Sequence, residues 1–142
     1  MLLLDTNILV YAHRRDSDRH EEYRAWLESM IDGPQPYAVS DQALMGMIRI
    51  VTNPQIYRQP ALIQEALAFA DQYRNQPHAH VLSPGPSFWG IFADLCGKAD
   101  ARANLIPDVY LAALAIEHGC ELVSADRDFL KFPGLRFSHP LI

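Results

Sequence analysis

The chain has 142 residues, about half of them hydrophobic, and a net charge of −5 from 12 basic and 17 acidic residues. This length accommodates one domain, residues 1–142, and excludes two independent hydrophobic cores. The negative net charge argues against a protein that binds nucleic acid through overall positive charge. The argument does not apply to a site in which the acids bind metal cations.

Cysteine usage and the first residues predict the cellular compartment. Cys96 and Cys120 do not form a C-x-x-C pair, which is typical of reduced thiols in a cytosol. The chain lacks the charged and long apolar segments of a signal peptide at its start, and no apolar stretch has membrane-spanning length. We therefore expect a cytoplasmic protein with no membrane association.

In the first half of the chain, short apolar runs alternate with helical periodicities. Asp5 and Ser40 each follow an apolar run and are suited to cap a helix. Gly33 and Asn53 each precede a proline and mark places where helices end. In chain order we expect a strand over 2–4, a helix through 8–11, a helix over 17–31, a strand over 37–39 and a helix through 44–51.

The second half continues the alternation after a loop over 52–60. Pro107 is tolerated in the first turn of a helix, and Gly119 favours the left-handed conformation that ends one. In chain order we expect a helix over 61–76, a strand over 81–82, a turn over 83–86, helices over 87–99 and 107–118, a strand over 121–123, a turn over 128–131 and an edge strand over 135–137.

This alternation predicts the fold class. Short buried strands between helices are typical of an α/β fold, with a parallel sheet of four or five strands covered by helices on both faces. In such open sheets, ligands bind at the carboxyl ends of the strands.

Aspartates gather at that edge of the predicted sheet. Asp5 follows the first strand, Asp126 and Asp128 follow the strand over 121–123, and Asp108 opens a helix. Carboxylates held close together repel one another unless a hard cation such as Mg²⁺ or Mn²⁺ neutralises them. Water activated by such an ion can hydrolyse a phosphodiester.

Each aspartate also has an ordinary structural interpretation. Asp5 can cap a helix, Asp108 can complement a helix dipole, and Asp126 and Asp128 can belong to a polar turn. For each aspartate taken alone, a structural role is at least about as common as a functional one. Only their joint placement favours a metal site.

Other patterns narrow the choice of chemistry. The six histidines have no H-x-x-H spacing, so a zinc site is disfavoured, and no glycine-rich phosphate loop is present, so a nucleotide cofactor is disfavoured. The basic stretch 13–20 is either a solvated loop or a local contact for RNA.

The motifs together resemble the PIN-domain nucleases, and especially VapC-type toxins of toxin–antitoxin systems. The matching segments are LLDTNIL at 3–9, MIRIVTNP at 47–54, PDVYLAALA at 107–115, SADRDF at 124–129 and FPGLRF at 132–137. The resemblance implies a Mg²⁺- or Mn²⁺-dependent endoribonuclease of a single PIN-like domain. It also implies an RNA substrate such as tRNA or rRNA, a VapB-type antitoxin as partner and a homodimer.

The resemblance also assigns roles by position. It implies that Asp5, Asp108 and Asp126 bind metal, that Asp128 assists catalysis or binds a second ion, and that Ser124 and Asn7 orient the carboxylates. One position departs from the family: PIN domains commonly carry a Glu three residues before an arginine such as Arg49.

Here that position is Gly46. Five helical residues separate it from Asp41, a rotation of about 140°, so Asp41 can contribute only at the rim of a site.

Two alternatives remain at this point. One is a catalytically degenerate PIN module that binds RNA or a protein partner without cleaving. The other is an aspartyl-nucleophile phosphatase, against which stands Asn7, in the place where such enzymes usually have a second acid.

Overall fold

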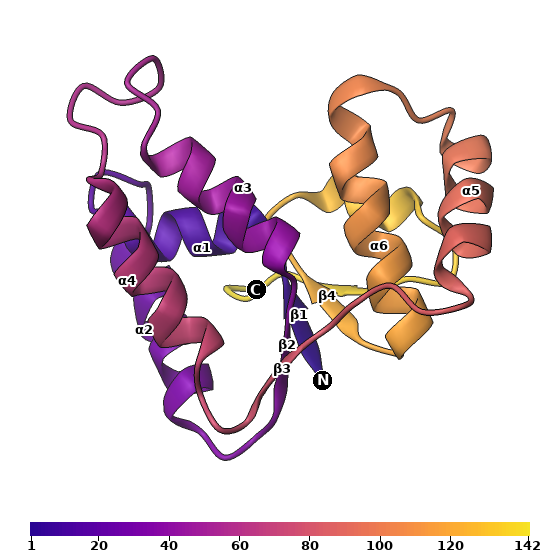
Figure 1. Ribbon diagram of the computed structural model, residues 1–142, viewed down its shortest axis with the longest axis horizontal. Helices are drawn as coiled ribbons and strands as arrows, with labels where there is room; N and C mark the ends of the chain where they lie inside the picture. Colours follow the sequence, from indigo (N-terminus) through magenta and orange to yellow (C-terminus); the bar gives the residue numbers. More distant parts are fainter.

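The computed structural model describes all residues 1–142, which fold around one five-stranded parallel sheet (Figure 1). In chain order the elements are β1 (Leu2–Leu4), α1 (Thr6–His13), α2 (His20–Asp32), β2 (Tyr37–Val39), α3 (Asp41–Val51), α4 (Ile63–Arg74), β3 (Ala79–Val81), α5 (Phe88–Ala99), the 3₁₀ helix η1 (Ala103–Leu105), α6 (Ile106–His118), β4 (Glu121–Val123), the 3₁₀ helix η2 (Arg127–Lys131) and β5 (Arg136–Ser138).

The strand order is β3-β2-β1-β4-β5, so the chain winds outward in both directions from the centre of the sheet. β1 pairs with β2 on one side and with β4 on the other, and Leu4 lies opposite Val123. The point between β1 and β4 is therefore the switch point of a doubly wound sheet, where a crevice opens beyond the carboxyl ends of the strands.

Successive side chains of the central strands point to opposite faces of the sheet and pack into two separate hydrophobic cores. Leu4 and Val123 belong to the cluster under α1, α2, α3 and α4, whereas Leu3 and Leu122 belong to the cluster under α5 and α6. Figure 1 shows α1 to α4 on the left of the sheet and α5 and α6 on its right. A slip of one residue would exchange the two faces, so the apolar pattern determines the register.

The α/β class and the parallel sheet with helices on both faces are confirmed, while several boundaries differ from expectation. The helix expected over 17–31 begins at His20, because Arg19 adopts a left-handed conformation with φ of 57°. The helix expected over 61–76 begins at Ile63, because the Ala61 amide donates to the Val51 carbonyl and remains tied to the end of α3. No helix combines the length and the apolar character needed to cross a membrane.

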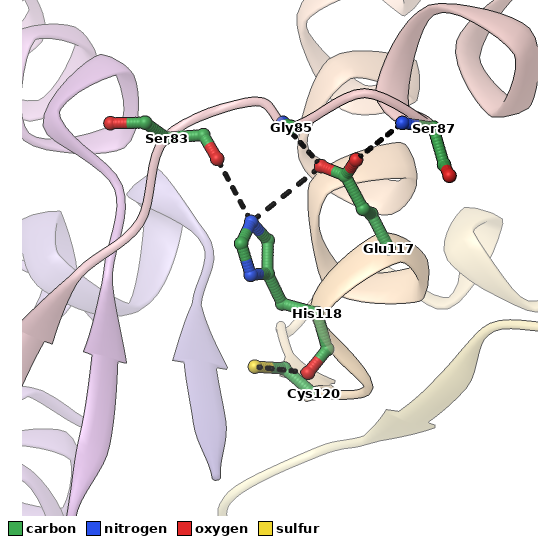
Figure 2. A network of polar contacts seen from close by, with 6 residues as sticks. All are labelled: Ser83, Gly85, Ser87, Glu117, His118 and Cys120. Carbon is green, nitrogen blue, oxygen red and sulfur yellow. Dashed lines mark hydrogen bonds and ion pairs between the residues drawn. The ribbon is translucent and has the colours of Figure 1, made fainter.

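A polar network attaches the loop between β3 and α5 to the end of α6 (Figure 2). The Glu117 carboxylate accepts hydrogen bonds from the backbone amides of Gly85 at 2.7 Å and Ser87 at 3.0 Å. The His118 ring bonds to the Ser83 carbonyl at 2.9 Å. We call these residues, Ser83, Gly85, Ser87, Glu117 and His118, the Glu117 clasp.

Gly85 lies close to the carboxylate of Glu117. A Cβ at this position would lie 2.8 Å from a carboxylate oxygen of Glu117. The chain crosses from β3, at one edge of the sheet, to the helix layer formed by α5 and α6, and the Glu117 clasp fixes this crossing segment to the end of α6.

Candidate active site

The site begins where β1 and β4 end side by side. The Asp5 amide donates to the Val123 carbonyl at 2.9 Å, which extends the parallel ladder by one bond and brings Asp5 beside Ser124. The two residues are 119 positions apart in sequence. Their proximity follows directly from strand pairing at the switch point.

Asp5 is buried, with 8% of its surface exposed, and both of its carboxylate oxygens accept a hydrogen bond. One oxygen accepts from the Thr6 amide at 2.7 Å, which makes Asp5 the N-cap of α1, and the other accepts from the Ser124 hydroxyl at 2.7 Å. Burial raises the pKa of Asp5 above its usual value, and the two hydrogen bonds partly oppose that effect.

The fully buried Ser124 hydroxyl organises the polar groups around Asp5. It donates to Asp5 and accepts from the Asp126 amide at 3.0 Å and from the Asn7 side-chain amide at 3.2 Å. The Asn7 carbonyl oxygen in turn accepts from the Ala125 amide at 3.4 Å. Ser124 and Asn7 therefore hold the Asp5 carboxylate and the backbone that carries Asp126 in one orientation.

Asp126 and Asp128 follow β4 at the start of η2. Asp126 is the N-cap of this 3₁₀ helix, and its side chain accepts from the Asp128 amide at 2.9 Å. Asp126 therefore does lie in a polar turn, as its structural interpretation expected, and this does not compete with a role in the site: a cap uses one carboxylate oxygen and leaves the other free.

Asp108 reaches the same place from the first turn of α6. Its pKa is raised to about 6, first by burial and then by the charges of Asp5 and Asp126. Lys131 and Asp128 contribute smaller, opposing effects. Three segments distant in sequence therefore place their carboxylates within electrostatic range of one another.

A cleft of about 490 Å³ lies over Asp5 and Asp108. Its walls include three polar residues that the sequence analysis did not assign to the site, Arg49, Asn104 and Tyr110. Arg49 is exposed and takes part in no ion pair, so it is a free cation beside the carboxylates. Its position one helical turn after Gly46 was the available signal.

Gly46 also lines this cleft, and the structure explains the absence of a larger side chain. A Cβ at Gly46 would lie 3.0 Å from the Thr6 hydroxyl, which donates to the Ala43 carbonyl at the contact between α1 and α3. Asp41 does not substitute for the missing acid: Arg74 binds both of its oxygens, at 2.7 Å and 3.0 Å.

The donor set fits a hard cation with an open coordination sphere. Asp5, Asp108, Asp126 and Asp128 present only oxygen atoms, and none of them takes part in an ion pair. No group of three or more His, Cys, Asp or Glu side chains is arranged so that it could hold a metal ion in this structure. Mg²⁺ characteristically keeps several waters and uses one or two carboxylates, so an open set of aspartates suits this ion.

Residues 2–135 match the PIN domain family. The chain is 41% identical over 141 residues to VapC ribonuclease Mb2897 of Mycobacterium bovis, covering 99% of this chain and 96% of that protein. It is 38% identical over 142 residues to Ribonuclease VapC25 of Mycobacterium tuberculosis, covering all of both chains.

Solved structures of low sequence identity share the fold. VapC20 of Mycobacterium tuberculosis, described as a Sarcin-Ricin loop cleaving toxin, superposes with a TM-score of 0.69 at 16% identity, covering 96% of this chain and 99% of that chain. VapBC2 from Rickettsia felis, bound to a DNA fragment from its promoter, gives a TM-score of 0.69 at 19% identity, covering 97% of each chain.

Proposed function

The chain belongs to the PIN-domain family, and from this premise we propose that it is a divalent-metal-dependent endoribonuclease, the toxin of a VapBC-type toxin–antitoxin pair. The observation that carries the proposal is the meeting of carboxylates from three segments without a cationic partner. Burial is the main cause of the raised pKa of Asp108, and repulsion from the charges of Asp5 and Asp126 adds to it. A site that accumulates such repulsion is typical of cation binding.

In this proposal Asp5, Asp108 and Asp126 hold the ion through carboxylate oxygens, and Asp128 assists at the more exposed side. A bound Mg²⁺ or Mn²⁺ ion would supply Lewis acidity toward the phosphoryl oxygen and make a water molecule acidic at neutral pH. Ser124 keeps Asp5 oriented through its 2.7 Å hydrogen bond, so the carboxylate need not reorganise when substrate binds.

Arg49 has a complementary task in the cleft. Arg49 lines the same cleft as the aspartates and carries the opposite charge. Its exposed guanidinium can therefore bind a phosphate of the substrate, because guanidinium geometry suits phosphate oxygens. The cleft therefore offers both an anionic site for a cation and a cationic site for the substrate backbone.

The relatives support the choice of substrate and partner. They are named ribonucleases, and solved neighbours include toxin–antitoxin complexes, among them one from Klebsiella pneumoniae with a TM-score of 0.61. We accordingly propose a structured RNA, tRNA or rRNA, as substrate and a VapB-type antitoxin as inhibitor. A homodimer in the cytoplasm is the assembly we propose.

Substitution of Asp5 by Asn tests the catalytic proposal, because it keeps the helix cap and removes the charge. The purified protein with Mg²⁺ or Mn²⁺ is expected to cut RNA, and Asp5→Asn to cut at least about a hundredfold more slowly. Asp94→Asn is the matched control, since it removes one exposed carboxylate from α5. Equal cutting by Asp5→Asn and the wild-type protein would refute the proposal.

Gly46 favours a second candidate, a PIN module that binds RNA or a partner without cleaving it. It leaves the cleft without the acid that the family commonly carries there. Calorimetry separates the two: the catalytic proposal requires Mg²⁺ or Mn²⁺ binding that Asp126→Asn abolishes. Absence of ion binding by the wild-type protein would favour the non-cleaving module.

A further inference from the structure

A second, larger groove lies away from the carboxylates and shares no lining residue with their cleft. It encloses about 1040 Å³ between the end of α1, the helices α2 and α4, and the loop that joins α3 to α4. α1 connects the two sites: Asp5 caps its first turn and His13 ends it. Eight helical residues correspond to about 12 Å along the axis.

The charge of this groove is opposite to that of the chain. Four arginines line it against three acids, a local charge of +1 with the two histidines neutral, although the chain as a whole carries a net charge of −5. A third of all the basic residues is thus gathered in one concave surface. Such local concentration is the electrostatic signature of a polyanion site in an acidic protein.

Two of these arginines are already committed to the fold. Arg14 binds both oxygens of Asp16, donates to the Gln59 carbonyl at 2.9 Å and lies over the Tyr57 ring, so it ties the α3–α4 loop to the end of α1. Arg24 pairs with Glu28 within α2 at 2.9 Å. Neither requires a ligand to explain it.

Arg15 and Arg58 have no such partner. Both are exposed, both line the groove, and neither takes part in a side-chain hydrogen bond or an ion pair. They come from different segments, the residue that follows Arg14 and the α3–α4 loop, and Arg14 joins these two segments. The fold therefore presents two free guanidinium groups in one groove.

The groove also holds an aromatic pair. The His13 ring packs on Phe69 of α4 with ring centroids 4.8 Å apart. Burial and the adjacent Arg14 lower the pKa of His13, which keeps the imidazole neutral at pH 7. Neutral aromatic surface beside free arginines is the combination with which proteins bind single-stranded nucleic acid: arginines contact phosphates, and rings contact bases.

We propose that this groove is a second RNA-binding site, in which Arg15 and Arg58 hold the phosphate backbone of a single-stranded segment while the cleft engages the scissile bond. The inference rests on the proposed function for the identity of the nucleic acid. A separation of about 12 Å along α1 corresponds to three or four stacked nucleotides at about 3.4 Å each. The groove therefore acts on long RNA and leaves very short RNA unaffected.

The test measures binding without cleavage. In metal-free buffer, the anisotropy of a fluorescein-labelled 20-nucleotide single-stranded RNA reports binding by the full-length wild-type chain. The double variant Arg15→Gln/Arg58→Gln is expected to bind about tenfold more weakly, with a slope of log K against log salt that is smaller by about 1.4. Lys98→Gln/Arg102→Gln is the matched control, because it removes two exposed cations outside both sites.

The outcomes separate this inference from the proposed function. Weaker binding by the groove variant alone supports the second site even if no cleavage is ever detected. Equal losses in the groove and control variants would indicate a general charge effect and overturn it. Unchanged RNA affinity together with loss of antitoxin binding would assign the groove to a protein partner, and would also overturn it.

Kinetics provides an additional check where cleavage occurs. On a 20-nucleotide RNA the groove variant is expected to raise KM several-fold at unchanged kcat, and on a dinucleotide, which is too short to reach the groove, to change neither. A fall in kcat on both substrates would show that Arg15 and Arg58 act through the structure of the active site rather than by holding RNA.

Discussion

Each end of α6 carries a partly buried acid, and the two differ in whether hydrogen-bond donors surround the carboxylate. Glu117, in the last turn, has 9% of its side chain exposed, and its two oxygens accept amide hydrogen bonds at 2.7 Å and 3.0 Å (Figure 2). Asp108, in the first turn, accepts no hydrogen bond and faces the charges of Asp5 and Asp126.

The helix dipole alone would rank these acids the other way. It favours a carboxylate at the N-terminus, where Asp108 lies, and disfavours one at the C-terminus, where Glu117 lies. Direct contacts decide instead, because an amide donor at hydrogen-bond distance outweighs a dipole effect of less than about 1 kcal/mol. Glu117 is thus a structural acid, whereas Asp108 has no ion-pair partner within the chain.

The sharpest test of this contrast is Asp108→Asn, which removes the charge and preserves the shape. Cleavage is expected to fall by at least about a hundredfold, because one of the proposed ion ligands is weakened. Stability in metal-free buffer is expected to rise, by less than about 1 kcal/mol once solvent screening is allowed for, because repulsion with Asp5 and Asp126 is removed. Parallel RNA-cleavage assays and urea denaturation measure both; a loss of stability would contradict the contrast.

Glu117→Ala is expected to show the reverse. Two amides of the clasp lose their acceptor, which costs about 2 kcal/mol of the free energy of unfolding, while the cleavage rate of the folded protein is retained. Urea denaturation with Asp94→Ala as control measures the effect, since Asp94 is an exposed acid on α5. If both variants lowered stability equally, the clasp would have no special role.

A pair of glycines on either side of the loop–helix junction tests the clasp sterically. Gly85→Ala places a Cβ 2.8 Å from Glu117 and is expected to cost about 1 kcal/mol. Gly90→Ala, within α5 and with no atom within 4 Å of its added Cβ, is expected to gain about 0.5 kcal/mol from helix propensity. Opposite shifts of thermal midpoint are the expected result, and shifts of the same sign would contradict it.

The smallest expected effect is a pH dependence that comes from Asp108. Its folded-state pKa of about 6 lies above the value of 3.8 expected when unfolded, so the folded state binds more protons between these limits. The wild-type protein, relative to Asp108→Asn, is therefore expected to lose stability as pH rises from about 4 to about 6, with no further change above. Denaturation of both proteins in metal-free buffer across this range measures the difference; parallel curves would show that Asp108 does not titrate there.

Elements bounded by local signals were predicted well. The strands over 37–39 and 121–123 have the expected bounds, which their short apolar runs indicate. The Asp5 and Ser40 caps and the Gly119 stop are confirmed, because each depends on a side chain bonding to backbone within a few residues or on a left-handed turn. β3 was expected over 81–82 but spans Ala79–Val81, because its bounds are set by pairing with β2 over Tyr37 to Val39. Leu82 lies outside the strand and only donates its amide to the Val39 carbonyl.

The candidate site divides in the same way. Asp5, Asp108, Asp126 and Asp128 could be proposed from sequence because each lies at the end of a strand or the start of a helix, where a parallel sheet gathers polar side chains. Arg49, with no partner in its own segment to mark it, was identified as part of the cleft only through the packing of α3.

The sequence by itself determined the order of the acidic motifs. It also determined the helix caps and the short apolar strands that are buried on both faces, since these depend on residues close together in the chain. Only the tertiary structure decided that Thr6 occupies the space beside Gly46, that Arg74 engages Asp41, and that Arg15 and Arg58 share a groove. The physical reason is that steric room and ion pairing depend on how segments distant in sequence pack together: α1 against α3, α3 against α4, and the end of α1 against the α3–α4 loop.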